Sequence, residues 1–113
     1  MEEKLAALKE GIGELSRRCP DEFKSFQRFL GSVLKDGKLD LKTKEFIALG
    51  IGLAVRCTYC IGLHVEGCYK AGATTDQIME AATVAVVMAG GPAYTYIADL
   101  KQAIDLFKDK YEG

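Results

Sequence analysis

The chain has 113 residues, of which 49% are hydrophobic and 27% are charged, and its formal net charge is −1 at pH 7. This length fits one domain spanning residues 1–113, and the composition is ordinary for a soluble globular protein. Because basic residues are dispersed and balanced by acidic ones, we expect no nucleic-acid partner and no binding to an acidic membrane surface. The segment from Met1 to Lys4 carries no apolar signal-peptide core, so a cytoplasmic location with reduced thiols is expected.

Two uncharged apolar runs fail as membrane spans. The run from Phe46 to Val55 is too short to cross a bilayer. The run from Ala81 to Ala98 is interrupted by Gly90-Gly91-Pro92, which predicts the end of one helix, a turn and the start of another. Since a domain of this size has little interior to bury both runs, we expect part of this surface to lie between subunits.

Helical periodicity without convincing strand alternation predicts an all-α fold. Lys4 to Arg18 places leucine and isoleucine at helical intervals, and Cys19-Pro20 interrupts this helix. Pro20 suits the first turn of a second helix, and Gly37 is expected to cap its C-terminus. The apolar face of this second helix is expected to pack in the core, and it consists of Phe23, Phe26, Phe29, Leu30, Val33 and Leu34.

The third predicted helix is apolar all round, as expected of a buried central helix. Asp40 can cap it, and it runs from about Leu41 to Arg56. Gly50 and Gly52 weaken its helix propensity, so we expect them to permit close contact with another helix.

Three further helices complete a predicted bundle of about six. The fourth begins within Cys57–Cys60, runs to about Ala71 and is ended by Gly72. A capping box formed by Thr74 and Gln77 starts the fifth, which ends near Ala89. The last helix follows Pro92 and ends in the charged segment 108–113.

The stretch from Cys57 to His64 holds two of the four cysteines and the only histidine. Residues three and four apart share a face of a helix, so Cys60 neighbours both Cys57 and His64. Thiol redox chemistry needs this combination of a nucleophile, a resolving thiol and a proton acceptor. Cys57 is nearer the helix N-terminus, which favours a thiolate, but Cys60 is one turn from the imidazole. We assign the attacking thiolate to Cys60 and the resolving thiol to Cys57.

A zinc site built from these residues and Cys68 is disfavoured by distance. Along one helix Cys57 and Cys68 would lie roughly 16 Å apart, and a tetrahedral ion with bonds of about 2.3 Å cannot gather them. No nucleotide-binding or dinucleotide fingerprint is present, so we expect no cofactor and no metal. The expected substrates are a hydroperoxide or a protein disulfide, and an external thiol or dithiol reductant must reset the pair.

A carboxylate could orient His64 or relay its proton. Glu66 would point away from His64 on the same helix. Glu45 lies within an apolar segment, where it is either a member of such a relay or a first-turn acid favoured by the helix dipole. The spacing alone leaves both interpretations of Glu45 open.

The spacing of Glu45, Cys57-Thr58-Tyr59-Cys60 and His64 resembles the signature of the AhpD-like alkylhydroperoxidases, in the carboxymuconolactone decarboxylase superfamily. The resemblance covers the central half of the chain, from about Leu39 to Gly90-Gly91-Pro92. It implies an all-helical homo-oligomer, a trimer or a hexamer. It also implies that Cys60 is the peroxidatic cysteine, that Cys57 resolves, and that Glu45 and His64 form a proton relay.

This chain departs from the best-known members at Tyr59, where they have a second histidine; Tyr59 is therefore an accessory candidate only. Those members have two such repeats and reduce a peroxiredoxin, whereas this chain has one repeat, so that partner is not carried over. The true decarboxylases of the superfamily lack the cysteine pair and act on a lactone acid. A decarboxylase-type lyase and a non-catalytic helical oligomer with structural cysteines remain the alternatives, and Cys19 and Cys68 are expected only to pack.

Overall fold

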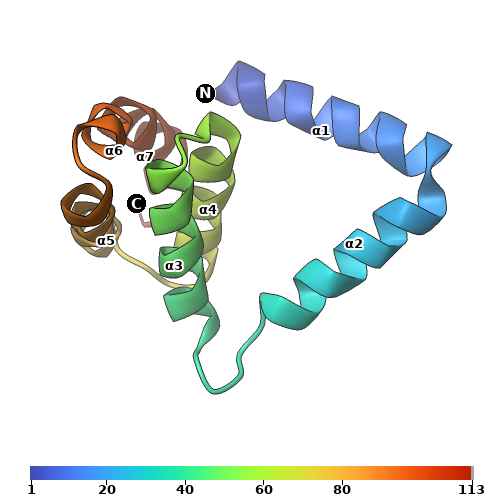
Figure 1. The fold of residues 1–113 in the computed structure, drawn as a ribbon, viewed down its shortest axis with the longest axis horizontal. Coiled ribbons are helices and arrows are strands. Elements are labelled where there is room, and N and C mark those ends of the chain that lie inside the picture. The colour runs from blue at the N-terminus through green and yellow to red at the C-terminus, as the bar shows by residue number, and fades with distance from the viewer. Residues whose placement is uncertain (113) are drawn as a thin grey trace.

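The computed structural model describes residues 1–112, which form seven helices and no strand. The expected all-α fold is therefore confirmed. In Figure 1 the first two helices form an arm that projects from a body made of the others. In the described part, no helix is both long enough and apolar enough to cross a bilayer. The helices are α1 (Glu2–Arg18), α2 (Pro20–Val33), α3 (Leu41–Ala54), α4 (Thr58–Lys70), α5 (Thr75–Ala89), α6 (Gly91–Thr95) and α7 (Ile97–Tyr111).

The core of the body surrounds α4, which packs between α3 and α7, while α5 packs on the other side of α3. Each leucine, isoleucine or valine side chain that is fully buried in this core stabilises the fold by about 1.5–3 kcal/mol. The largest side chains that are fully buried are Leu49 and Leu53 of α3, Ile61, Val65 and Cys68 of α4, Ile78 of α5 and Leu100 of α7.

The predicted caps of the body helices are confirmed. The Asp40 carboxylate accepts the Thr43 N–H at 2.7 Å, and the hydrogen bonds from Thr43 lower the pKa of Asp40. Thr74 and Gln77 form the reciprocal capping box of α5. Gly72 ends α4 in the left-handed region, with φ 93°, which glycine adopts without steric cost.

Four details of the helix prediction are wrong. The C-cap of α2 is Leu34, and Gly37 lies in the following loop, where its N–H donates to the Leu39 carbonyl. The third helix ends at Ala54 rather than Arg56. The last helix is split at Tyr96 into α6 and α7. A Cβ at Gly50 would meet nothing within 4 Å, so this glycine permits no close contact.

The expectation that the aromatic face of α2 packs in the core is also wrong. No residue of α1 or α2 is buried, and the side chains of Phe26 and Phe29 are 59% and 64% exposed. The reason is visible in Figure 1, where α1 leads away from the body and α2 returns from the far point, so that only the C-terminal end of α2 comes near α3. Lys44 of α3 holds that end by donating to the Val33 and Lys35 carbonyls, at 2.8 Å each.

The other end of the arm, at the start of α1, packs against α4. A Cβ at Gly62 would lie 2.8 Å from the Met1 sulfur and 2.9 Å from a methyl carbon of Leu5. Gly62 therefore provides the space in which the start of α1 contacts α4, so the arm is attached to the body at both of its ends.

Candidate active site

The site begins at the turn that reverses the chain between α3 and α4. Cys57 N–H donates to the Gly52 carbonyl at 2.9 Å, and Arg56 N–H donates to the Leu53 carbonyl at 3.2 Å. This is the Schellman pattern of a helix C-terminus, which requires a left-handed residue. Arg56 takes that conformation, with φ 59°. The turn thus delivers Cys57 directly to the start of α4.

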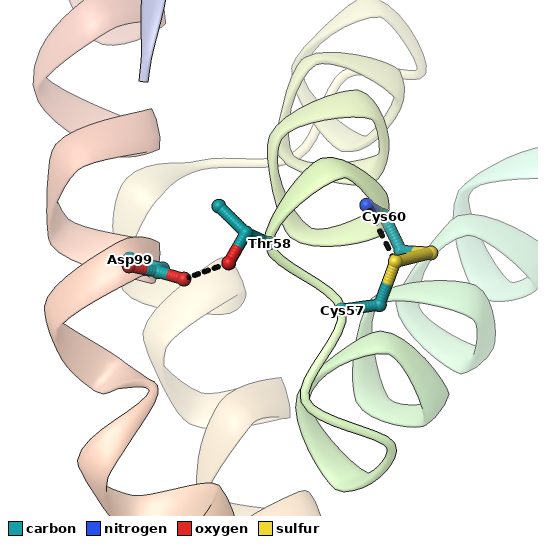
Figure 2. Close-up of a disulfide and its surroundings, with 4 residues drawn as sticks. All are labelled: Cys57, Thr58, Cys60 and Asp99. Atoms are coloured by element: carbon teal, nitrogen blue, oxygen red, sulfur yellow. Dashed lines mark hydrogen bonds between the residues drawn. A yellow bond between two sulfur atoms is a disulfide. The ribbon is translucent and has the colours of Figure 1, made fainter. Parts of the chain in front are cut away.

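The two cysteines of the motif are joined in a disulfide across the first turn of α4 (Figure 2). Cys57 is the N-cap of α4, and its sulfur accepts the Cys60 N–H at 3.2 Å. The two Cα atoms are 5.2 Å apart, which is within the range that a disulfide spans. Both sulfurs therefore lie at the positive end of the α4 dipole, which favours a thiolate.

Helix α3 also packs closely against the cysteine pair. A Cβ at Gly52 would lie 3.1 Å from the Cys60 Cβ, which is tighter than an ordinary contact. The expectation that Gly52 permits close helix contact is therefore confirmed, and the other helix is α4 at Cys60.

An imidazole and a carboxylate complete the site one turn further along α4. His64 Nδ1 lies 2.6 Å from Oε1 of Glu45, which comes from α3 and is only 7% exposed. An ionised carboxylate only accepts hydrogen bonds, so with Glu45 in that form Nδ1 carries the hydrogen and Nε2 is the ring nitrogen left to accept a proton. Cys60 and His64 are four residues apart on one face of α4. The structure thus joins Cys57 to Cys60 and Glu45 to His64, and helical spacing puts the second pair one turn from the first.

The two residues between the cysteines fix the first turn of α4 from other sides. The Thr58 hydroxyl donates to Asp99 of α7 at 2.7 Å (Figure 2). The Lys4 amino group of α1 lies 5.6 Å from the centre of the Tyr59 ring, within the range of a cation–π contact. Tyr59 therefore lies next to the arm. Asp99 was missed by sequence reasoning, because it is 41 residues from Thr58 and no local spacing links them.

The remaining candidates lie outside this arrangement. Glu66 was expected to point away from His64, and its carboxylate accepts a hydrogen bond from the Tyr111 hydroxyl of α7 at 2.8 Å. Cys19 is half-buried between α1 and α2, and Cys68 is buried. Burial, with the negative charge of Glu45, raises the pKa of Cys68 to about 12, which keeps this thiol protonated and inert.

Two surface grooves are lined mainly by apolar side chains, and neither includes a cysteine or His64. One, of about 650 Å³, lies between α1, α4 and α7. The other, of about 400 Å³, lies between α3 and α5. Among residues 1–112, no group of three or more histidine, cysteine, aspartate or glutamate side chains is arranged to hold a metal ion.

Comparisons with known proteins agree with one another. The model of the carboxymuconolactone decarboxylase family matches residues 20–102. A Legionella pneumophila protein of that family has a crystal structure that superposes with a TM-score of 0.86 at 32% identity, covering 90% of this chain and 91% of that one. A Thermotoga maritima family member, described with a suggested role in antioxidative response, superposes at 0.76 with 30% identity, covering 96% and 91%. The uncharacterized protein 4 of the cox locus of Paracoccus denitrificans is 40% identical over 85 residues, 75% of this chain and 77% of that protein.

Proposed function

This chain belongs to the carboxymuconolactone decarboxylase family, and on that premise we propose that it is a thiol-dependent peroxidase or disulfide oxidoreductase of the AhpD-like type. One observation carries the proposal: a disulfide at the start of α4 lies one helical turn from a histidine that is hydrogen-bonded to a buried glutamate. A structural disulfide would not need a proton acceptor beside it.

Each residue has one task in the proposed reaction. His64 Nε2 accepts the proton of Cys60, and Glu45 stabilises the resulting imidazolium through the Nδ1 hydrogen. The Cys60 thiolate attacks the outer oxygen of a hydroperoxide, the O–O bond breaks, and the alkoxide takes a proton from His64 to leave as an alcohol. Cys60 is then a sulfenic acid. With a protein disulfide as substrate, the same thiolate forms a mixed disulfide instead.

Resolution and reset follow from the position of Cys57. The Cys57 thiol attacks the Cys60 sulfenic acid, so the disulfide forms and water leaves. An external dithiol then reduces the disulfide by exchange and is itself oxidised to a disulfide. Such a donor is maintained in a reducing compartment, so we propose that the protein acts in the cytoplasm.

The test is peroxide consumption by the reduced protein. We expect the chain to lose two titratable thiols on treatment with a hydroperoxide. Cys60→Ser should abolish turnover, and Cys57→Ser should accumulate a sulfenic acid that a dimedone-type reagent traps. Cys19→Ser is the matched control, and it should turn over normally. Full turnover by Cys60→Ser would overturn the proposal.

The same protein preparations distinguish the proposed oxidoreductase from a decarboxylase-type lyase. Decarboxylation of a carboxymuconolactone by protein whose cysteines have been alkylated would identify the chain as a lyase and contradict thiol chemistry. Thiols of the reduced pair that resist alkylation in the folded chain would instead favour a purely structural role for the cysteines.

We further propose that the protein is a homo-oligomer, and that a second copy covers its uncovered apolar surfaces. In support, the aromatic face of α2 contacts little of its own chain, and the groove between α3 and α5 is flanked by exposed Val84 and Met88. The trimer or hexamer implied by the AhpD-like resemblance is the expected assembly.

A further inference from the structure

Glu45 reaches His64 across a part of α4 where one residue has no side chain. Gly67 lies one turn beyond His64, on the same face of the helix. A Cβ at this position would lie 2.5 Å from the carboxyl carbon of Glu45 and 2.7 Å from Oε1, with Oε2 closer still. These are distances that real Cβ atoms do not show, so any other residue at position 67 must displace the carboxylate.

We propose that Gly67 is a positioning residue for the proton relay. The Glu45 carboxylate occupies the space that a side chain at position 67 would fill, and from there it contacts His64 Nδ1. This inference rests on the proposed function for its catalytic consequence. The geometric part stands without it, since it concerns only the contact between Glu45 and α4.

The surroundings of the Glu45 carboxylate leave it few alternative positions. Glu45 is almost completely buried, and its Oε1 is already 2.6 Å from Nδ1. Cys68, the residue that follows Gly67, is fully buried, and the charge of Glu45 contributes to the raised pKa of its thiol. A carboxylate displaced by a methyl group at position 67 therefore cannot keep its place between the imidazole and the helix.

The relay depends on this placement through the histidine tautomer. With Glu45 accepting from Nδ1, the neutral ring carries its hydrogen on Nδ1 and presents Nε2 as the base. If the carboxylate moves away, the hydrogen bond that favours this tautomer is lost, and the fraction of His64 able to take a proton at Nε2 falls.

The first experiment reads the tautomer directly in the reduced protein, without substrate. Because His64 is the only histidine, ¹⁵N-histidine labelling gives one pair of ring nitrogen signals. We expect the Nδ1–H form in the natural sequence and loss of that preference in Gly67→Ala. Gly11→Ala is the matched control, since it makes the same exchange within α1 where an added Cβ meets nothing within 4 Å; it should keep the Nδ1–H form. Retention of the Nδ1–H form in Gly67→Ala would overturn the proposal.

The second experiment measures alkylation of Cys60 at pH 7 by mass spectrometry. We expect Gly67→Ala to slow it by about 10-fold, and to have no further effect when Glu45→Ala is already present, because the added methyl then has room. Equal slowing by Gly67→Ala in both backgrounds would show a merely structural role and contradict the proposal.

The double variant also answers the question of folding. If Gly67→Ala alone fails to fold, Glu45→Ala/Gly67→Ala should fold as well as Glu45→Ala, which locates the clash at the carboxylate. A double variant that is unfolded while Glu45→Ala folds would overturn the proposal. An absence of peroxide turnover by the natural protein would defeat the proposed function and leave the tautomer result untouched.

Discussion

At the scale of single residues, the turns before and after α4 have the same hydrogen-bond pattern with different residues at the left-handed position. After α4, Ala73 N–H donates to the Cys68 carbonyl and Gly72 occupies the left-handed position. Before α4, Arg56 occupies it, although a side chain there costs about 1–2 kcal/mol. The strained turn is the one that leads into the cysteine pair, and such strain is characteristic of functional sites.

Arg56→Gly should therefore stabilise the protein by about 1 kcal/mol, because glycine removes the steric cost of the left-handed backbone. Urea unfolding of the oxidised protein measures this change. The converse exchange, Gly72→Ala, should destabilise by about 1 kcal/mol or more. A loss of stability in Arg56→Gly would mean that contacts of the arginine side chain outweigh the strain.

Cys68 predicts a pH dependence of stability. Burial raises the pKa of this thiol from 9.0 to about 12, so between these values the unfolded chain releases a proton that the folded chain retains. The contribution of Cys68 to stability is therefore complete below pH 9 and is lost as the pH rises toward 12, up to about 4 kcal/mol over the whole interval.

Urea unfolding from pH 8 to pH 10.5 tests this linkage against Cys68→Ala. At pH 8 the variant should be the less stable by about 1 kcal/mol, because it leaves a small cavity. Above pH 9 the natural protein should lose stability faster, so the difference between the two should shrink and then change sign before pH 10.5. A constant difference across this range would mean that the folded thiol ionises normally.

At the scale of helices, the sequence is informative where the determinant is local. The caps at Asp40, Thr74 and Gly72 were predictable because each depends on residues within one turn. Periodicity also predicted a helix after Pro20. It could not predict what covers the aromatic face of that helix, because amphipathicity indicates burial without naming the partner.

The first turn of α4 depends on a contact that local rules do not predict. Thr58→Val keeps the shape of the side chain and removes the hydroxyl that donates to Asp99. We expect a loss of about 1–2 kcal/mol in urea unfolding, since a partly buried carboxylate is left without this donor. Thr83→Val is the control, because the Thr83 hydroxyl donates only to the Glu80 carbonyl on the exposed side of α5; it should cost clearly less. Equal losses would show that the Thr58–Asp99 bond adds nothing.

At the scale of the whole molecule, the site divides into a part that spacing encodes and a part that only the fold assembles. The neighbourhood of Cys57, Cys60 and His64 follows from helical geometry. The contact of Glu45 with His64 spans 19 residues, and spacing alone left it open until the family resemblance favoured it. Asp99 and Gly67 could not be predicted, since their importance arises from which helices meet.

The exposed aromatic face of α2 leads to a prediction about self-association, because burying this face against a second copy removes apolar surface from water. Burying a phenylalanine ring contributes about 1.5–3 kcal/mol, so replacing Phe26 and Phe29 together with serine should weaken self-association by at least about 100-fold. The body should keep its structure, because neither side chain belongs to its core.

Light scattering after size-exclusion chromatography should therefore show an oligomer for the natural protein and a folded, smaller species for Phe26→Ser/Phe29→Ser. Lys24→Ser/Gln27→Ser changes two exposed polar side chains of the same helix and should leave the mass unchanged. If the natural protein is a monomer, or if both double variants dissociate equally, the aromatic face is not the contact between copies. The site would then have to work with α2 uncovered, on the single chain shown in Figure 1.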